Sequence, residues 1–281
     1  VSLVSIFFVN GLDEGVDFVG GRTFQVKFEK PVDAAVVSDE LSAAFGTPVE
    51  AKILGDDDQL KITTKYKIKE DGIAIDEEVN QKLYKALQKY YPNTSYDQFI
   101  NSYDGKQVGV LQASKVGASI SEDIKTNSYW AVLGAMAAIF LYLMISFRKW
   151  QYSLGAIAAV AHDVIFVLGI YSLCYKFMPF HMEMDQHFIA AILTVIGYSM
   201  NDTVIVFDRI REFIIGNRKG SFEDIVNASI NTTLSRTLNT SLTMIIVLLT
   251  MFIFGGESIR GFIFAMLVGI DPGGLGGVAY L

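Results

Sequence analysis

Three charged residues lie inside long apolar runs, where a charge is costly. Asp163, Asp202 and Arg236 each interrupt a stretch of mostly apolar residues. A carboxylate or guanidinium in hydrocarbon costs at least about 2.5–3.5 kcal/mol, so such a group usually faces the interior of a helix bundle and serves transport. Desolvation favours the protonated form of a carboxylate and a nearby cation favours its charged form, whereas arginine stays charged. We therefore predict that Asp202 changes protonation beside a fixed partner, Arg236, which would couple ion passage to helix movement.

Helix geometry predicts the depth of each charge. At 1.5 Å per residue, Asp202 lies roughly 7 Å from the cytoplasmic side of a core about 30 Å thick, and Arg236 lies roughly 6 Å deep. These two residues are thus expected to meet on consecutive helices. Asp163 lies roughly 18 Å deep, near the middle of the core, and is the weaker candidate for the ion pathway.

Polar side chains accompany these charges at helical spacing. One predicted face carries Thr194, Tyr198, Asn201 and Asp202, and one face of the next helix carries Arg236, Asn239, Thr240 and Thr243, beside Thr237. We expect the two stripes to face each other, with Tyr198, Asn201, Thr237 and Thr240 supporting the ion pair. Small residues let helices approach closely, and a third face is lined by Gly155, Ala159 and Asp163.

Structural explanations of the same residues stay open. Arg236 is shallow enough to extend to lipid headgroups. Asp163, which follows His162, can be a satisfied packing residue, and Asp202 can be purely structural. The chain has one cysteine, Cys174, and no His/Cys spacing typical of a metal site. We expect no enzyme, no cofactor and no metal, and the net charge of -7 argues against a nucleic-acid partner.

The elements that carry these residues are predicted membrane spans. A span needs about 20 mostly apolar residues, and the matching segments with their flanks are 130–147, 152–175, 187–207 and 232–254, with partial ones at 1–9 and 259–270. Arginine and lysine concentrate in the loops after 147 and after 207, which are therefore cytoplasmic. The fold class expected is an α-helical membrane bundle of about five to six helices, the first and last incomplete, with an extracytoplasmic α+β domain.

This reading divides the chain into three parts. Residues 1–12 are the end of a first span, residues 13–126 form the extracytoplasmic domain, and residues 127–281 form the bundle with a cytoplasmic loop at 209–231. Most charged residues lie in 13–126.

The polar domain shows a regular alternation of elements. Strands are predicted at 22–28, 49–54, 59–67 and 107–113, with a turn at Asp56–Asp58, and helices at 32–45 and 77–91. The order strand–helix–strand–strand–helix–strand predicts a sheet covered on one face by helices. Residues 64–106 look like an insertion on this plan.

Two segments near the spans are harder to interpret. The amphipathic stretch 222–230 is either a helix along the membrane surface or an ordinary helical connector. In the tail 271–281, Pro272 and four glycines disfavour a helix. Either the last helix is interrupted there, or the sequence is altered or truncated at this point.

Several of these segments resemble the SecD/SecF family of protein-export membrane proteins. GVDFVGGRTFQV (15–26) is similar to the family's DFxGG signature, and IAAILTVIGYSMNDTVIVFDRIRE (189–212) to the SecF span with its GYSxNDTVVVFDRIRE pattern. AIAAVAHDVIFVLG (156–169) and SRTLNTSLTMI (235–245) match the neighbouring spans. KVGASISEDI (115–124) is similar to a VGP segment, with Ala118 in place of the proline. The likeness covers most of residues 13–268.

The resemblance implies a function in protein export. Family members work in the cytoplasmic (inner) membrane of bacteria as multi-pass subunits, and SecF works with SecD beside the SecYEG channel. They are distant relatives of proton-driven RND transporters and use the proton (or sodium) motive force to assist translocation of an unfolded polypeptide. By motif, Asp202 and Arg236 would be ion-pathway residues, with Asp163 weaker. The chain could also be the SecF half of a fused SecDF polypeptide. The alternatives are part of an RND-type small-molecule exporter and a translocase scaffold that does not transport.

Overall fold

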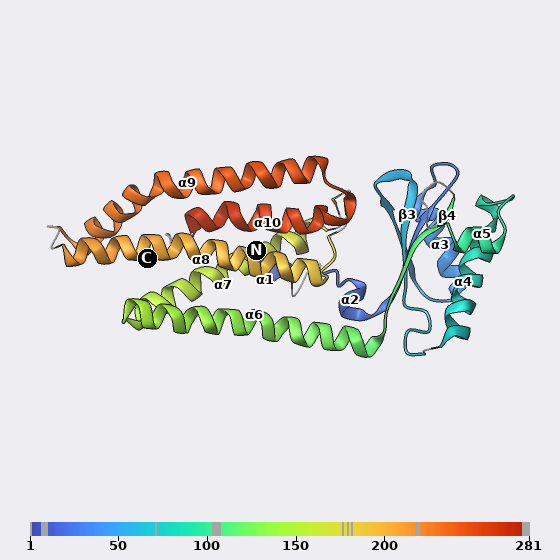
Figure 1. Ribbon diagram of the computed structural model, residues 1–281, viewed down its shortest axis with the longest axis horizontal. Helices are drawn as coiled ribbons and strands as arrows, with labels where there is room; N and C mark the ends of the chain where they lie inside the picture. Colours follow the sequence, from blue (N-terminus) through green and yellow to red (C-terminus); the bar gives the residue numbers. More distant parts are fainter. Residues whose placement is uncertain are drawn as a thin grey trace.

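The charged segment and the apolar segments of the sequence form two separate parts of the structure, a sheet domain and a helix bundle (Figure 1). The computed structural model describes residues 2–6, 11–70, 72–102, 108–175, 177–178, 180, 182–216 and 220–276. Two short helices, α1 (Ser2–Val4) and α2 (Val16–Val19), precede the sheet domain. The bundle consists of α6 (Ala118–Phe147), α7 (Trp150–Cys174), α8 (Gln186–Ile215), α9 (Phe222–Phe254) and α10 (Glu257–Gly276).

The sheet domain is an antiparallel four-stranded sheet with helices on one face. Its elements are β1 (Gly21–Lys27), α3 (Ala34–Phe45), β2 (Val49–Leu54), β3 (Asp56–Thr64), α4 (Ile73–Leu87), η2 (Gln88–Tyr90), α5 (Tyr96–Ile100) and β4 (Gly109–Val116). The strand order is β2-β3-β1-β4, and each neighbouring pair is antiparallel. This is the split βαβ arrangement of ferredoxin-like domains, and it confirms the predicted order of strands and helices.

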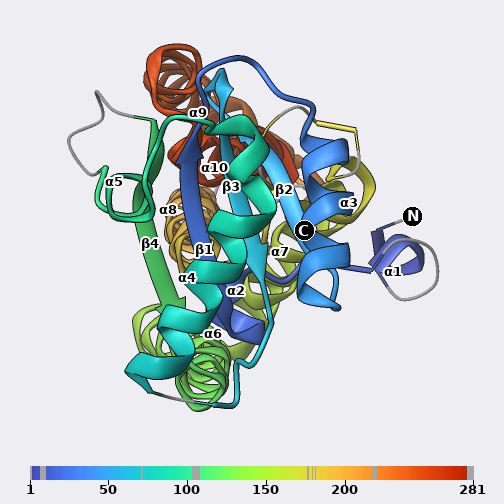
Figure 2. The ribbon, with the colours of Figure 1, turned by 90° about the vertical axis from the view of Figure 1, so that its right-hand side faces the viewer.

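The two faces of the sheet have different partners. Phe24 and Val26 of β1 are buried in a core shared with Leu41 of α3 and Leu83 of α4. Successive strand residues point to opposite faces, so Thr23 of β1 points away from that core. Figure 2 shows α3 and α4 on one side of the sheet and the bundle on the other. The polar face of the sheet therefore looks toward the ends of the membrane helices.

The prediction that residues 64–106 are an insertion is wrong for the helix at its centre. Val79, Leu83 and Leu87 of α4 are fully buried in the same core as the sheet. Because α4 contributes these three side chains to the helical layer, the sheet could not fully bury its apolar face without it. The predicted turn also differs: Gly55, whose φ is +78°, makes it, and Asp56 already belongs to β3.

An ion pair ties α4 to the sheet and makes this domain sensitive to acid. The guanidinium of Arg22, 3% exposed, donates to Asp76 at 2.8 Å, and Lys115 lies 3.1 Å from the same carboxylate. The hydrogen bond from Arg22 lowers the pKa of Asp76, although partial burial opposes it. A lowered folded-state pKa contributes stability that is present above the unfolded value and is lost as the pH falls through the folded value.

We expect Asp76→Asn to destabilise the sheet domain at neutral pH only. Asp76 is about half exposed, so the cost should be only about 1 kcal/mol at pH 7. Once the pH falls below the lowered folded-state pKa of Asp76, the wild-type carboxyl is protonated as well, and the two proteins should become equally stable. Denaturant titrations at pH 7 and at a series of acidic pH values, monitored by hydrogen exchange of the β1 and β3 amides, measure this. A difference in stability that stays the same at every pH would contradict the assignment.

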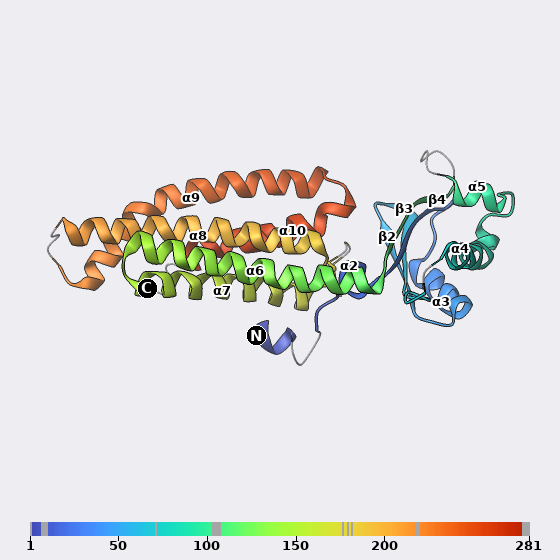
Figure 3. The same cartoon turned by 60° about the horizontal axis from the view of Figure 1, so that its bottom comes forward.

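The bundle is organised around α8 and α10. Among the described residues, α6, α7, α8 and α9 are long and apolar enough to cross a membrane, and α10 contains a shorter apolar stretch, Ile259–Ile270. Helix α10 packs against α7, α8 and α9, and Tyr171 of α7 donates a hydrogen bond to the carbonyl of Gly261. Figure 3 shows α6 and α7 along the opposite side of α8 from α9.

Helix α10 crosses α8 at a glycine. A Cβ added at Gly269 would lie 2.4 Å from a methyl carbon of Val195. We expect Gly269→Ala to separate the two helices and lower stability by about 1–3 kcal/mol, seen as a lower midpoint of thermal unfolding in detergent. Gly134→Ala is the control, because nothing lies within 4 Å of its added Cβ. Equal midpoints for the two variants would refute this crossing.

Two expectations about helix ends are resolved. Residues 222–230 are the first turns of α9, which starts at a capping box of Ser221 and Asp224. These residues are therefore helical and continuous with the span of α9. The expectation that Pro272 interrupts the last helix is wrong, since α10 continues to Gly276; membrane helices tolerate proline and glycine where neighbours satisfy the freed backbone groups. The rest of the tail, 277–281, lies outside the described residues.

Candidate functional site

Asp202 is buried on α8 with one carboxylate oxygen unpaired. Its side chain is 4% exposed, and within the described part of the chain its Oδ2 has no hydrogen-bond partner. Arg236 is exposed on α9 and acts on Asp202 electrostatically. In the described residues the two charges form no direct ion pair. The structure thus brings the predicted pair close enough to attract each other but does not join them.

Asp163 is joined to α8 directly. It is 2% exposed on α7, its Oδ2 accepts a hydrogen bond from the hydroxyl of Ser199 at 2.6 Å, and its Oδ1 lies 3.2 Å from Nδ1 of His162. Ser199 precedes Asp202 by about one helical turn. The same α7 face approaches α8 at Gly155, where an added Cβ would lie 3.7 Å from the Phe207 ring. The Asp163 carboxylate therefore contacts α8 about one helical turn from the buried carboxylate of Asp202.

The prediction that two polar stripes face each other is wrong. On α8, Thr194 and Asn201 are exposed, and Tyr198, which is half-buried, contacts Ser241 of α9 at 3.4 Å. On α9 the exposed polar residues are Arg236, Asn239, Thr240 and Thr243, whereas Thr237 is buried. Helix α10 packs against both α8 and α9, and the apolar faces of all three helices share one core. Apart from Asp202, Thr237 and the half-buried Tyr198, the residues of both stripes therefore lie on the surface of this bundle.

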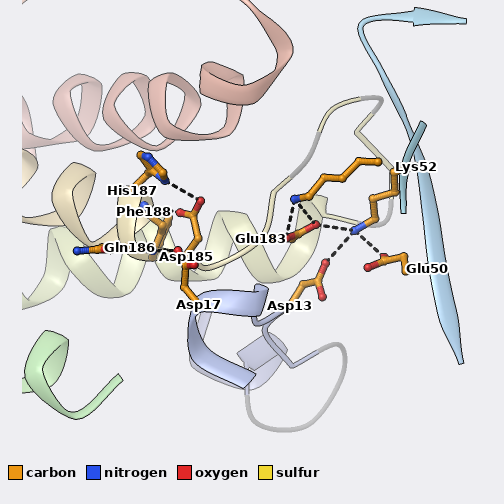
Figure 4. Close-up of polar contacts among 10 residues, drawn as sticks. Asp13, Asp17, Glu50, Lys52, Glu183, Asp185, Gln186, His187 and Phe188 are labelled. Atoms are coloured by element: carbon orange, nitrogen blue, oxygen red, sulfur yellow. Dashed lines mark hydrogen bonds and ion pairs between the residues drawn. The ribbon is translucent and has the colours of Figure 1, made fainter. Parts of the chain in front are cut away.

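The outer end of α8 is fixed to the segment that enters the sheet domain (Figure 4). The backbone N–H of Met184 donates to the carbonyl of Asp13 at 2.7 Å, and that of Gly15 donates to the carbonyl of Met184 at 2.9 Å. The carboxylate of Asp17 accepts from the backbone N–H of Gln186 at 3.1 Å. Helix α8 thus carries Asp202 within the bundle, and its outer end is bonded to the segment that leads into the sheet.

Four charged residues, Asp13, Lys52, Lys61 and Glu183, form a docking cluster between the sheet and the bundle. Glu183, only 9% exposed, lies 3.1 Å from Lys61 and 3.6 Å from Lys52. Lys52 also lies 3.3 Å from Asp13. Burial lowers the pKa of Lys52, but Glu50, Glu183 and Asp13 together raise it above its usual range, so the lysine stays charged.

Sequence reasoning missed this docking cluster. Glu183 was visible only as an acidic residue in a short loop, and its partner Lys61 lies 122 residues away in the chain. An alternating polar face on β3 gave the only available signal, since a face that does not contact the domain's own helices must meet either water or another part of the protein.

The DFVGG segment makes the turn from α2 into β1. Phe18 is buried in the bundle core, and Gly20 has a φ of +76°, which suits glycine. A Cβ at Gly21 would lie 2.9 Å from Val16. The two glycines therefore let the chain reverse tightly between the bundle and the sheet.

A second group of side chains at this end has metal-ligand chemistry. One ligand atom each from Asp17, Asp185 and His187 lies within 4.8 Å of the others. No His/Cys spacing in the sequence indicates this group, because Asp17 lies far in the chain from Asp185 and His187.

Comparisons with known proteins agree with this architecture. The family model "Protein export membrane protein SecD/SecF, C-terminal" matches residues 96–278, and "SecD/SecF GG Motif" matches residues 5–32. The chain is 41% identical to the protein translocase subunit SecF of Rhodothermus marinus, over 97% of this chain and 82% of that protein. It is 34% identical to SecF of Cereibacter sphaeroides, over 94% and 76%.

A solved structure shares the fold. The crystal structure of SecDF from Thermus thermophilus, a translocon-associated membrane protein, superposes with a TM-score of 0.75 at 30% identity, covering 99% of this chain. This chain spans about a third of the SecDF chain, 34% of its length. The matched family models, the identity to SecF subunits and the shared fold together lead to one assignment. The chain belongs to the SecD/SecF family of protein-export membrane proteins, on its SecF side, as a multi-pass inner-membrane protein with a sheet domain on the extracytoplasmic face.

Proposed function

We propose that this chain is a non-enzymatic, ion-coupled subunit that assists protein export with SecD, or a SecD half, and the SecYEG channel, acting on an unfolded polypeptide. The observation that carries the proposal is Asp202, a buried carboxyl group whose Oδ2 has no hydrogen-bond partner in the described residues. It lies on a helix whose outer end is tied to the extracytoplasmic domain. An intramembrane ionisable residue of this kind is a functional candidate by its cost alone.

The mechanism follows from what protonation changes. When Asp202 takes up a proton, its attraction to Arg236 on α9 disappears, and the two helices lose a force that favours one arrangement. Asp163, already bonded to Ser199 on α8, serves as a second carboxyl group on the same path. Movement of α8 is transmitted along about 24 Å of helix from Asp202 to Gln186. There the docking cluster passes it to the sheet domain.

The exposed polar stripes support a partner within the membrane. Arg236 and Asn201 lie on the surface of the bundle, and polar groups at membrane depth usually face protein or water. A second helix bundle of the same family, such as a SecD half, would cover these polar residues and give them a protein environment. The SecDF chain, about three times as long as this one, has room for such a half.

Export driven by the ion gradient tests the proposal. Secretion of a reporter is measured in cells in which this subunit is present or depleted, with and without an uncoupler that collapses the proton gradient, and with sodium varied. The proposal predicts that the subunit raises export only while a gradient exists. Support of export that is independent of the gradient would favour the scaffold. Drug resistance conferred by expression alone would favour the small-molecule exporter.

A further inference from the structure

Three side chains at the junction of the bundle and the sheet are arranged like metal ligands. Asp185 Oδ2 lies 3.1 Å from Nδ1 of His187, and an oxygen of Asp17 completes a group within 4.8 Å (Figure 4). Two ligands of a tetrahedral zinc ion, each about 2.0–2.1 Å from the metal, are separated by about 3.3 Å. The spacing of the Asp185 and His187 atoms is therefore close to that of a shared metal.

A polar cavity adjoins these ligands and contains an unpartnered hydroxyl. The cavity holds about 220 Å³ and is lined by Asp17, Asp185 and His187 together with the polar sheet residues Thr23, Gln25 and Ser114. Thr23 is 7% exposed, and within the described residues its Oγ1 has no hydrogen-bond partner. A buried hydroxyl without a partner costs free energy, and a cavity of this size accommodates an ion with its bound water.

The charges and ligand types select the kind of ion. The neighbouring Glu183 is already paired with Lys61, so Asp17 and Asp185 leave about two negative charges for the site. One imidazole nitrogen with two carboxylates suits zinc and similar divalent transition metals better than calcium, which takes six to eight oxygen ligands. We propose that Asp17, Asp185 and His187 bind one divalent transition-metal ion, whose bound water is held by Thr23.

Such an ion would pin α2 to the outer end of α8. Asp17 belongs to α2, while Asp185 and His187 lie at the start of α8. The metal would add a bond between the same two segments that the backbone pairing of residues 13–15 with Met184 already joins. The proposal concerns binding only and does not depend on ion-driven export.

Metal titration of the purified full chain in detergent tests the site. After treatment with a chelator, the protein is titrated with Co²⁺, followed by its visible absorption, and then with Zn²⁺ in competition. We expect one equivalent to bind with a spectrum of tetrahedral type, and His187→Gln to weaken the affinity at least about 10-fold. His187 is largely exposed, so this variant should fold normally.

Two isosteric variants and one histidine control complete the test. Asp17→Asn and Asp185→Asn keep an oxygen for the N–H groups of Gln186 and Phe188 but remove the charge, and each should also weaken binding at least about 10-fold. His162→Gln, on α7 beside Asp163, should leave the affinity unchanged. Absence of saturable binding would overturn the proposal. So would equal affinity of wild type and His187→Gln, or loss of binding in His162→Gln.

Discussion

Asp202→Asn is expected to reduce export to the level seen when the ion gradient is collapsed, while the protein still accumulates and assembles. Asparagine has nearly the size of aspartate, so the buried position on α8 remains filled. It cannot gain or lose a proton at physiological pH, so the attraction to Arg236 can no longer be switched. The measurement is secretion of a reporter with and without uncoupler, together with the amount of protein recovered in the membrane.

Asp208→Asn is the matched control for this experiment. It removes a carboxylate from the same helix, but Asp208 is exposed, so its charge carries little desolvation cost and its loss should leave gradient-driven export intact. Arg236→Met removes the other charge of the pair and should resemble Asp202→Asn. If both Asp202→Asn and Arg236→Met showed normal gradient-driven export, the proposal of an ion-coupled subunit would be abandoned in favour of a scaffold function.

Glu183→Gln is expected to loosen the sheet domain from the bundle. The change leaves the ammonium groups of Lys61 and Lys52 without the carboxylate that lies 3.1 and 3.6 Å from them. Breaking a buried pair on one side costs up to 3–5 kcal/mol, and because both lysines are partly exposed we expect about 2 kcal/mol. Opening of the junction should then become roughly 30-fold more frequent. Hydrogen exchange of the Gly15 and Met184 amides, whose bonds join the two parts, measures it.

Glu50→Gln separates docking from the loss of a charge. Glu50 lies 2.6 Å from the same Lys52, but both residues belong to β2, so this pair does not cross the junction. Exchange of the Gly15 and Met184 amides should stay close to wild type in this variant. If both variants exchanged equally fast, the docking cluster would not be what holds the domain. If Glu183→Gln also lowered gradient-driven export, α8 would be supported as the link between Asp202 and the sheet domain.

Local chemistry in the sequence determined the membrane helices, the order of the sheet elements and the positions of the buried charges. Apolar runs of about 20 residues favour a membrane environment. The hydrophobic periods of strands and helices differ enough to distinguish the two kinds of element. Asp163 and Asp202 stood out because a charge within such a run is expensive. For the same reason both were expected inside the bundle, where they are found.

Only the tertiary structure decided which groups meet. The register of β3 and the loop before α8 bring Lys61 to Glu183, a contact across 122 residues that no local pattern encodes. Packing of α10 against both α8 and α9 turned the predicted facing stripes outward. Helix α4, predicted from the sequence to be part of an insertion, instead belongs to the helical layer that covers the sheet. Each outcome depends on how apolar faces compete for burial over the whole chain, whereas the cost of a single buried charge is a local quantity.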